Sequence, residues 1–118
     1  GHAAGDAILS KLGGVMRQHV RDEDFVARMG GEEFIVLLSN MCMEQACHVA
    51  ERLRGTIESM PGEVPVTVSI GVAQVQPRES LASATHRADE ALLHAKQTGR
   101  NRIVRASSVD VCTVSATR

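Results

Sequence analysis

The fold is decided by the stretch FVARMGGEEFIVLL, residues 25–38. Residues 25–29 and 32–38 are rich in branched and aromatic side chains, a composition that is typical of β-strands. Gly30 and Gly31 lie between them and can adopt the positive φ angles that a tight hairpin turn requires. The stretch therefore predicts an antiparallel hairpin. The apolar run at its far end predicts that the second strand is buried on both faces.

Helices and strands alternate on both sides of this hairpin. Helical spacing of apolar residues and runs of β-branched residues predict the remaining elements. These are helices over 4–19, 43–59 and 80–98, and β-rich segments over 64–75 and 101–105. Residues 107–118 have no helical period and are predicted to form a loose tail. The order of elements predicts an α/β (α+β) fold, with helices packed on the faces of an antiparallel-rich sheet.

Length and composition exclude several classes of protein. The chain has 118 residues, 43% of them hydrophobic, which suits one domain with a real core. A net charge of -1 argues against non-specific binding to nucleic acid or anionic lipid. No apolar run approaches the length of a membrane span. Three cysteines (Cys42, Cys47 and Cys112) form no paired spacing, so we expect reduced thiols rather than a disulfide framework or a zinc site.

Two carboxylates follow the glycine turn directly. Glu32 and Glu33 are neighbours in an extended chain, so their side chains point to opposite faces and only one can face a ligand at the turn. A turn without side chains lets a ligand approach the backbone, and carboxylates beside it suit Mg²⁺, which prefers oxygen ligands and substrate phosphates. The alternative is a structural hairpin whose turn happens to be Gly-Gly and whose glutamates are solvated.

Five further motifs stand in a fixed order around this turn. They are GHAAGD (1–6), RDED (21–24), FVARM (25–29), VTVSIGVA (66–73) and ADEALLHAK with GRN (88–101). In these motifs the chain resembles the GGDEF family of diguanylate cyclases, in the variant spelled GGEEF. The resemblance divides the chain into a GGDEF domain, residues 1–106, and a C-terminal tail, residues 107–118. It implies a palm-like sheet flanked by helices, as in nucleotide cyclases and polymerases.

The resemblance also implies a reaction. Family members condense two GTP molecules into cyclic di-GMP, with one GTP on each of two facing domains and with Mg²⁺ or Mn²⁺ as the cofactor. Glu32 is implied as the catalytic carboxylate and a metal ligand, and Glu33 as a secondary metal ligand. Gly30 and Gly31 would let the nucleotide lie against the backbone. GTP as substrate, cyclic di-GMP as product and a second GGDEF domain are the implied partners.

Four more residues match the family's substrate site. Asp6 matches the position that recognises guanine, and His2 a position near the nucleotide. The alternatives are a helix cap for Asp6 and a packing or turn residue for His2. Lys96 and Arg100 match the basic pair that holds the terminal phosphates. Favourable charge at a helix C-terminus would also explain that pair.

Arg21 and Asp24 match the family's inhibitory product site. An arginine can donate two hydrogen bonds to the O6 and N7 edge of guanine, and an aspartate can accept from its N–H edge. Arg52 matches a secondary arginine that helps there. The alternative for the motif is a solvated charge cluster. Its spacing to Gly30 favours the product site, so we expect binding of cyclic di-GMP and product inhibition.

The chain departs from the family at its start. Family members begin with a strand that carries a metal-binding Asp, followed by a Lys and an Asn, whereas this sequence starts at the glycine of GHAAGD. That first strand lies inside the family's sheet, so its absence predicts unpaired strand edges. Truncation, an unseen strand and strand exchange with a second copy all remain open. We expect weak or no catalysis by this chain alone, and a non-catalytic cyclic di-GMP- or GTP-binding module is the second hypothesis. We also expect a cytoplasmic location, without contact to nucleic acid or membrane, unless an upstream region anchors the parent protein.

Overall fold

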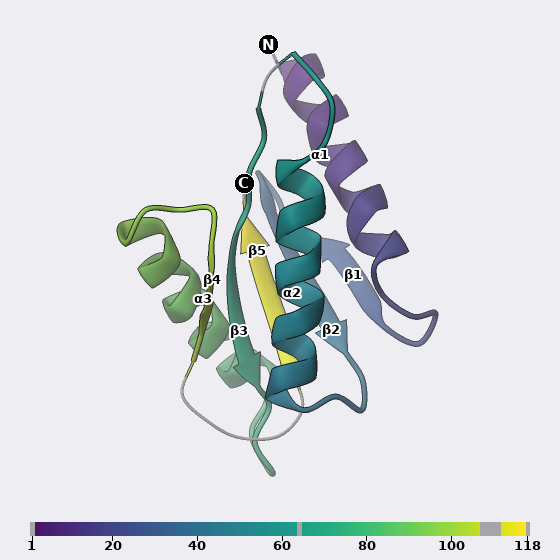
Figure 1. Ribbon diagram of the computed structural model, residues 1–118. Helices are drawn as coiled ribbons and strands as arrows, with labels where there is room; N and C mark the ends of the chain where they lie inside the picture. Colours follow the sequence, from purple (N-terminus) through teal and green to yellow (C-terminus); the bar gives the residue numbers. More distant parts are fainter. Residues whose placement is uncertain (1, 64, 107–111, 118) are drawn as a thin grey trace.

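A five-stranded sheet organises the chain in the computed structural model, which describes residues 2–63, 65–106 and 112–117. The elements are α1 (His2–Gln18), β1 (Phe25–Arg28), β2 (Glu33–Leu38), α2 (Met43–Glu58), β3 (Ser69–Gln74), α3 (Leu81–Gln97), β4 (Ile103–Arg105) and β5 (Cys112–Thr117). The strand order is β1-β2-β5-β3-β4 (Figure 1). All pairs are antiparallel except β3 with β4. The mixed α/β architecture predicted from the sequence is confirmed.

The predicted hairpin is present. β1 pairs antiparallel with β2, and Arg28 lies opposite Phe34. Gly30 and Gly31 have φ angles of 100° and 53°, the positive values that the prediction required. The Met29 amide donates to the Glu33 carbonyl at 2.8 Å and closes the turn. The turn therefore holds Glu32 and Glu33 in a fixed relation to the end of the sheet.

The prediction of a loose tail is wrong for the described part of that segment. Residues 112–117 form β5, which lies between β2 and β3 and pairs antiparallel with both. The boundary between domain and tail at residue 106 fails with it, whereas residues 107–111 and 118 lie outside the described residues. The open gap expected inside the sheet is also absent, because β5 supplies backbone partners to both neighbouring strands.

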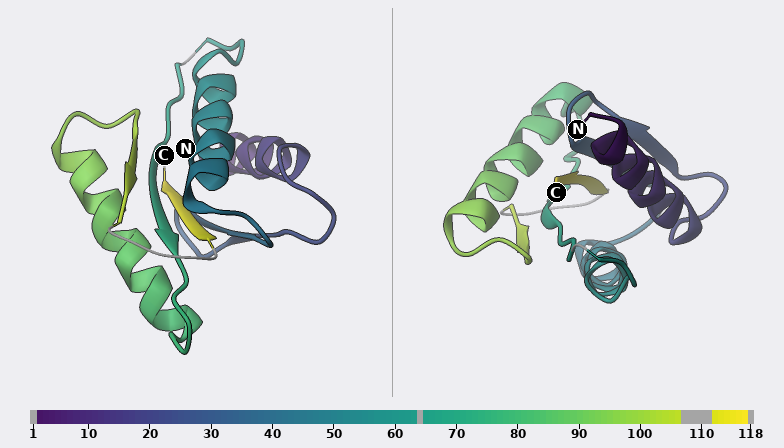
Figure 2. Two further views of the ribbon diagram at one scale, coloured as in Figure 1. Left: turned by 60° about the horizontal axis from the view of Figure 1, so that its bottom comes forward. Right: turned by 90° about the horizontal axis from the view of Figure 1, so that it is seen from above.

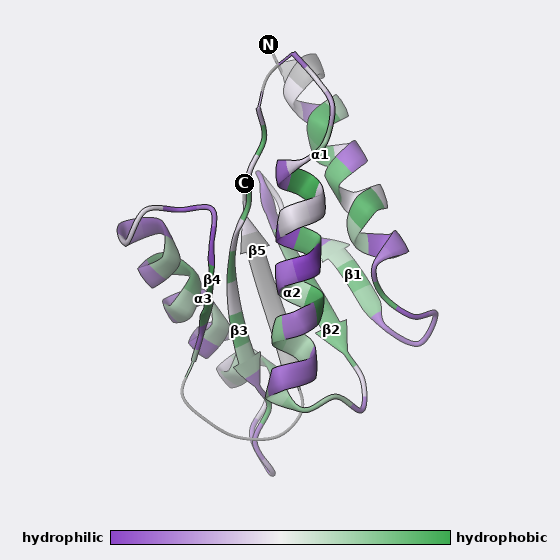
Figure 3. Cartoon of the chain, viewed as in Figure 1, coloured by the Kyte–Doolittle hydropathy of each residue, from purple (hydrophilic) through white to green (hydrophobic). Residues whose placement is uncertain are grey.

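One face of the sheet carries the main core. Helices α1 and α2 pack there against alternate residues of β2 and β3 (Figure 1). The most deeply buried side chains include Leu12 and Met16 of α1, Leu53 and Ile57 of α2, and Ile70 of β3. The outward side of α2 is hydrophilic (Figure 3), so the helix has the amphipathic pattern that its sequence predicted.

On the other face of the sheet, α3 packs against β3, β4 and β5 (Figure 2). The helix presents a row of buried alanines, among them Ala84, Ala88 and Ala95, which lets its backbone approach β3 closely. A Cβ added to Gly71 would lie 2.1 Å from the Ala88 carbonyl oxygen. The glycine of the VTVSIGVA motif is therefore the point at which strand and helix touch.

Element boundaries differ from prediction mainly in the strands. The β-rich segment 64–75 forms a strand only over Ser69–Gln74, and the last predicted strand, 101–105, begins at Ile103. Arg100 and Asn101 have φ angles of 61° and 46°, far from the negative φ angles of a regular strand. Ser80 caps α3 by accepting a hydrogen bond from the Ser83 amide at 3.0 Å.

Among the described residues, no helix is long and apolar enough to cross a bilayer.

Candidate functional site

The glycine turn presents its two carboxylates differently. Glu32 lies in the turn and is exposed, whereas Glu33 begins β2 and is half-buried. Glu33 lies directly opposite Thr117 of β5, and Thr117 lies opposite Ser69 of β3. Residues opposite one another across a sheet point to the same face. Gly71 stands two residues after Ser69 on β3, so it shares the face of Ser69, and this face is covered by α3 at Gly71. Glu33 is therefore on the α3 side of the sheet.

Arg28 joins this turn to α1, a role that the sequence analysis missed. Its Nε donates to the Gly31 carbonyl at 2.9 Å, and its Nη2 donates to Asp6 Oδ1 at 3.4 Å. Asp6 lies in the second turn of α1, because the helix begins at His2, so the alternative of a helix cap is wrong. The structure thus brings Asp6 to the glycine turn. The signal in the sequence was an arginine two residues before Gly30, at the end of a strand.

The basic pair lies at the same end of the sheet. The amide of Asn101, the neighbour of Arg100, donates to the Ser69 hydroxyl at 3.2 Å. Since Ser69 stands two strands away from Glu33, the backbones of these two residues are roughly 10 Å apart. Lys96 is half-buried in the last turn of α3 and Arg100 is exposed. Within the described residues, the structure records no ion pair for either side chain, so both cations can receive an anion.

His2 belongs to α1, but its side chain lies outside the described residues, so its predicted contact with the nucleotide stays a prediction.

The RDED segment lies at the opposite end of β1. Asp24 is 4% exposed, and its Oδ1 accepts from the Ser39 amide while its Oδ2 accepts from the Arg21 amide, both at 2.9 Å. Burial raises the pKa of Asp24, but the hydrogen bonds from Ser39 and Arg21 outweigh it and hold that pKa below its usual value. The segment is therefore not the solvated charge cluster that we set as the alternative, because its aspartate is a buried anchor for the loop.

Arginines surround this loop. Arg17, which the sequence analysis missed, donates to the Asp24 carbonyl at 2.7 Å, and Arg52 of α2 donates to the His19 carbonyl at 3.3 Å. The Arg21 side chain is 45% exposed, and it also donates to the Ser39 carbonyl. The structure therefore brings Arg21, Asp24 and Arg52 into one region, with the guanidinium groups outside and the carboxylate covered.

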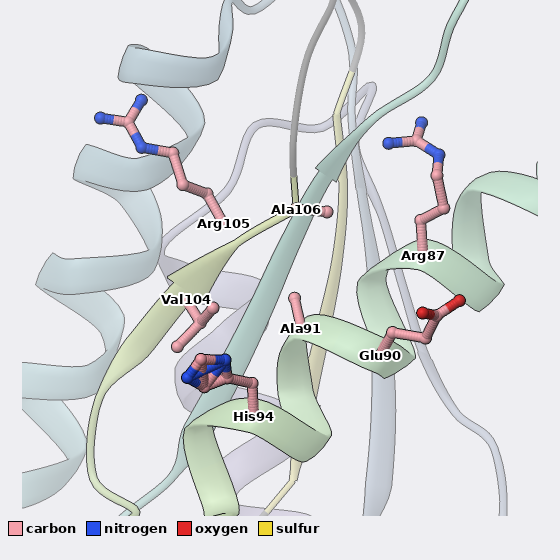
Figure 4. Close-up of a pocket in the computed structure, with 7 residues that line it drawn as sticks. All are labelled: Arg87, Glu90, Ala91, His94, Val104, Arg105 and Ala106. Carbon is pink, nitrogen blue, oxygen red and sulfur yellow. The ribbon is translucent and has the colours of Figure 1, made fainter. Parts of the chain in front are cut away.

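A separate hollow of about 370 Å³ lies between α3 and β4 (Figure 4). Arg87 and Arg105 stand at its rim, but their side chains point away from one another in Figure 4. Arg87 is also held by Glu79 at 2.6 Å, and this pair lowers the pKa of Glu79 to about 2. None of the predicted site residues lines this hollow. Its charged groups do not converge on a common point, so we assign it no ligand.

The donor set at the glycine turn limits what metal it can hold. In the part of the chain that the structure describes, no three His, Cys, Asp or Glu side chains converge as a metal cage. Mg²⁺ does not require such a cage, because it keeps several waters and takes one or two carboxylates together with substrate phosphates. A carboxylate at this turn therefore fits a Mg²⁺ ion that arrives with a nucleotide, and the described residues do not offer the closed ligand set of a permanently bound structural metal.

The structure is thus a mixed α/β domain with a glycine turn and two carboxylates at one end of its sheet and a basic helix end near the same edge. The family described as "Diguanylate cyclase, GGDEF domain" matches residues 1–102. The chain belongs to the GGDEF family.

Relatives of known sequence support this membership. Over 109 residues the chain is 43% identical to "Diguanylate cyclase A" of Treponema denticola, which covers 87% of this chain and 29% of that protein. It is 41% identical over 108 residues to "Diguanylate cyclase DgcP" of Pseudomonas aeruginosa, covering 87% of this chain and 16% of that protein. The chain thus spans less than a third of the length of these relatives.

Solved structures share the fold. The active GGEEF domain of a diguanylate cyclase from Vibrio cholerae superimposes with a TM-score of 0.83 at 34% identity, covering 92% of this chain and 72% of that one. The GGDEF domain of DgcB from Caulobacter crescentus, solved in complex with c-di-GMP, gives a TM-score of 0.85 at 32% identity, covering 92% and 68%. The resemblance inferred from the motifs is confirmed.

Proposed function

We propose that this domain binds GTP and serves diguanylate cyclase activity, joining two GTP molecules into cyclic di-GMP when two such domains face one another. The observation that carries the proposal is that the carboxylate turn lies at the same end of the sheet as the basic pair, for which the described residues provide no ion-pair partner. Membership of a family whose relatives are named diguanylate cyclases agrees with it.

The chemistry assigns a task to each side chain. The 3′-hydroxyl of one GTP attacks the α-phosphate of the other, a phosphate ester bond forms, and pyrophosphate leaves. Lys96 and Arg100 hold the terminal phosphates, where their positive charge stabilises the departing pyrophosphate. We assign Asp6 to the N–H edge of guanine, and its contact with Arg28 beside the turn supports this role.

The turn carries the remaining tasks. The exposed Glu32 would assist removal of the hydroxyl proton and hold the metal ion, and Glu33, which lies on the α3 side, would be its secondary ligand. Gly30 and Gly31 leave room for the nucleotide beside the backbone. A bound Mg²⁺ or Mn²⁺ ion would supply charge stabilisation at the phosphates.

The substitution Glu32→Ala tests this assignment. In the protein that carries this domain, it should abolish synthesis of cyclic di-GMP from GTP·Mg²⁺, measured by chromatography of the products. Glu44→Ala is the matched control, because Glu44 lies in the first turn of α2 and lies outside the proposed site. Full activity of the Glu32→Ala protein would overturn the catalytic role of this residue.

Cyclic di-GMP is proposed to bind at Arg21 and Arg52 and to inhibit the enzyme. The half-exposed Arg21 guanidinium can reach a guanine edge, and Arg52 lies near it on α2. The covered carboxylate of Asp24 supports this site by holding the Arg21 backbone and side chain. Arg21→Ala should therefore remove binding of cyclic di-GMP in calorimetric titration and spare synthesis. Undiminished affinity would place the inhibitory site elsewhere.

A non-catalytic binding module is the second candidate. It is favoured by the small donor set at the turn, since the described residues offer no third carboxylate to a metal ion there. Titration of the chain with cyclic di-GMP and, separately, with GTP·Mg²⁺ separates the two candidates. Binding of both ligands together with turnover supports the cyclase, and binding without turnover supports the module. We further propose a second GGDEF domain as the partner and the cytoplasm, where GTP is available, as the location.

A further inference from the structure

A row of polar side chains crosses the sheet at the end that carries the glycine turn. The row runs from Glu33 of β2 to Thr117 of β5 and on to Ser69 of β3, which stand opposite one another. Thr117 is 3% exposed and Ser69 is 2% exposed. A hydroxyl group is costly to bury unless it is hydrogen-bonded, so each of these two residues needs a partner.

Both hydroxyl groups have a hydrogen-bond partner. Thr117 Oγ1 donates to the Glu32 carbonyl at 3.1 Å, and Ser69 Oγ accepts from the Asn101 amide at 3.2 Å. The first bond reaches the turn that carries the carboxylates. The second reaches the segment that follows Arg100. Thr117 and Ser69 are paired neighbours, so the two bonds connect the acidic and basic parts of the candidate site through the sheet.

The bond from Thr117 ties the turn to β5, in addition to the hydrogen bonds that the Met29 amide, the Glu33 amide and the Arg28 side chain make within the hairpin. Gly30 and Gly31 have no side chains, and the exposed Glu32 precedes the first residue of β2. A buried hydrogen bond to the Glu32 carbonyl therefore restricts the rotation of the peptide that follows Glu32. This restriction sets the direction in which the Glu32 side chain leaves the turn.

We propose that Thr117 is a positioning residue for Glu32. The Thr117 hydroxyl holds the glycine turn in the position from which Glu32 can contact a metal-bound nucleotide. Ser69 holds the segment that follows Arg100 at the same end of the sheet. The strand that completes the sheet thus also orders the candidate site. The consequence for nucleotide binding rests on the proposed function, whereas the ordering of the turn does not.

The test compares Thr117→Val with Thr117→Ser. Valine keeps the branched shape and loses the hydroxyl, and serine restores it. We expect Thr117→Val to raise the hydrogen-exchange rates of the amides of residues 31–33 roughly 5-fold, measured by NMR, and Thr117→Ser to return them toward the original values. We expect the affinity for Mn²⁺·GTP to fall by a similar factor in Thr117→Val and to recover in Thr117→Ser.

Thr56→Val is the matched control, because Thr56 lies on α2 and its hydroxyl contacts the His19 ring rather than the glycine turn. Unchanged exchange at residues 31–33 in Thr117→Val, or an equal rise in Thr56→Val, would overturn the proposal. If Thr117→Val does not fold, Ser69→Ala takes its place, and faster exchange of the Asn101 amide is then the expected result. Faster exchange in a protein that binds no GTP would support the positioning role and reject the proposed function, so the two can fail separately.

Discussion

Gly71→Ala is the most direct test of how α3 packs on the sheet. The added Cβ would lie 2.1 Å from the Ala88 carbonyl oxygen, 2.5 Å from the Leu92 amide nitrogen and 3.0 Å from the Leu92 Cα. All three are backbone atoms of one helix, so no side-chain rotation can relieve the contact. The helix would have to move away from β3 by roughly 1 Å to restore ordinary van der Waals contact.

The expected cost is at the upper end of the range for overpacked cores, about 3 kcal/mol. For a domain of this size, that corresponds to a fall in Tm of roughly 10 °C, measurable by circular dichroism or calorimetry.

Gly14→Ala is the control, because Gly14 is exposed in α1 and an added Cβ there would meet nothing within 4 Å. That substitution should stabilise the protein by about 0.5–1 kcal/mol, since alanine is the better helix former. The two variants make the same chemical change and should shift Tm in opposite directions. A Gly71→Ala protein as stable as the original would refute the close packing of α3 on β3.

Three further outcomes follow from the contacts described above. Removal of residues 112–118 should abolish cooperative unfolding in urea, because β2 and β3 pair with β5 and would each lose a partner; a sharp transition at the original midpoint would contradict this role. The pKa of Glu79 is lowered to about 2 by Arg87, so its contribution to stability should be present above about pH 4.5 and lost as the pH falls toward 2, a dependence that Glu79→Gln should flatten in acid denaturation. Because hydrogen bonds lower the pKa of Asp24 despite its burial, Asp24→Asn should likewise weaken the fold most at neutral pH and least in acid, which the same titration checks.

Local patterns were sufficient to predict most of the elements and the location of the candidate site. The hairpin follows from two β-rich runs joined by Gly30-Gly31, because that pair tolerates the positive φ angles of the turn. The amphipathic helices follow from the spacing of their apolar residues. The family followed from the order of separated motifs, which no single motif could have supplied, and the residue roles that the family implies stay predictions.

The tertiary structure decided three features that no local pattern carries. Residues 112–117 form the central strand because β2 and β3 would otherwise have unpaired backbone groups on either side of one gap. This requirement comes from distant segments, so the local sequence of residues 112–117 does not predict the strand. Asp24 became a buried anchor because the chain folds back to place the Ser39 amide beside it.

Arg28 joined the glycine turn to Asp6 because α1 crosses the end of β1. In each case the sequence determined the residue and its chemistry. Only the packing of distant segments determined which partner that chemistry would meet.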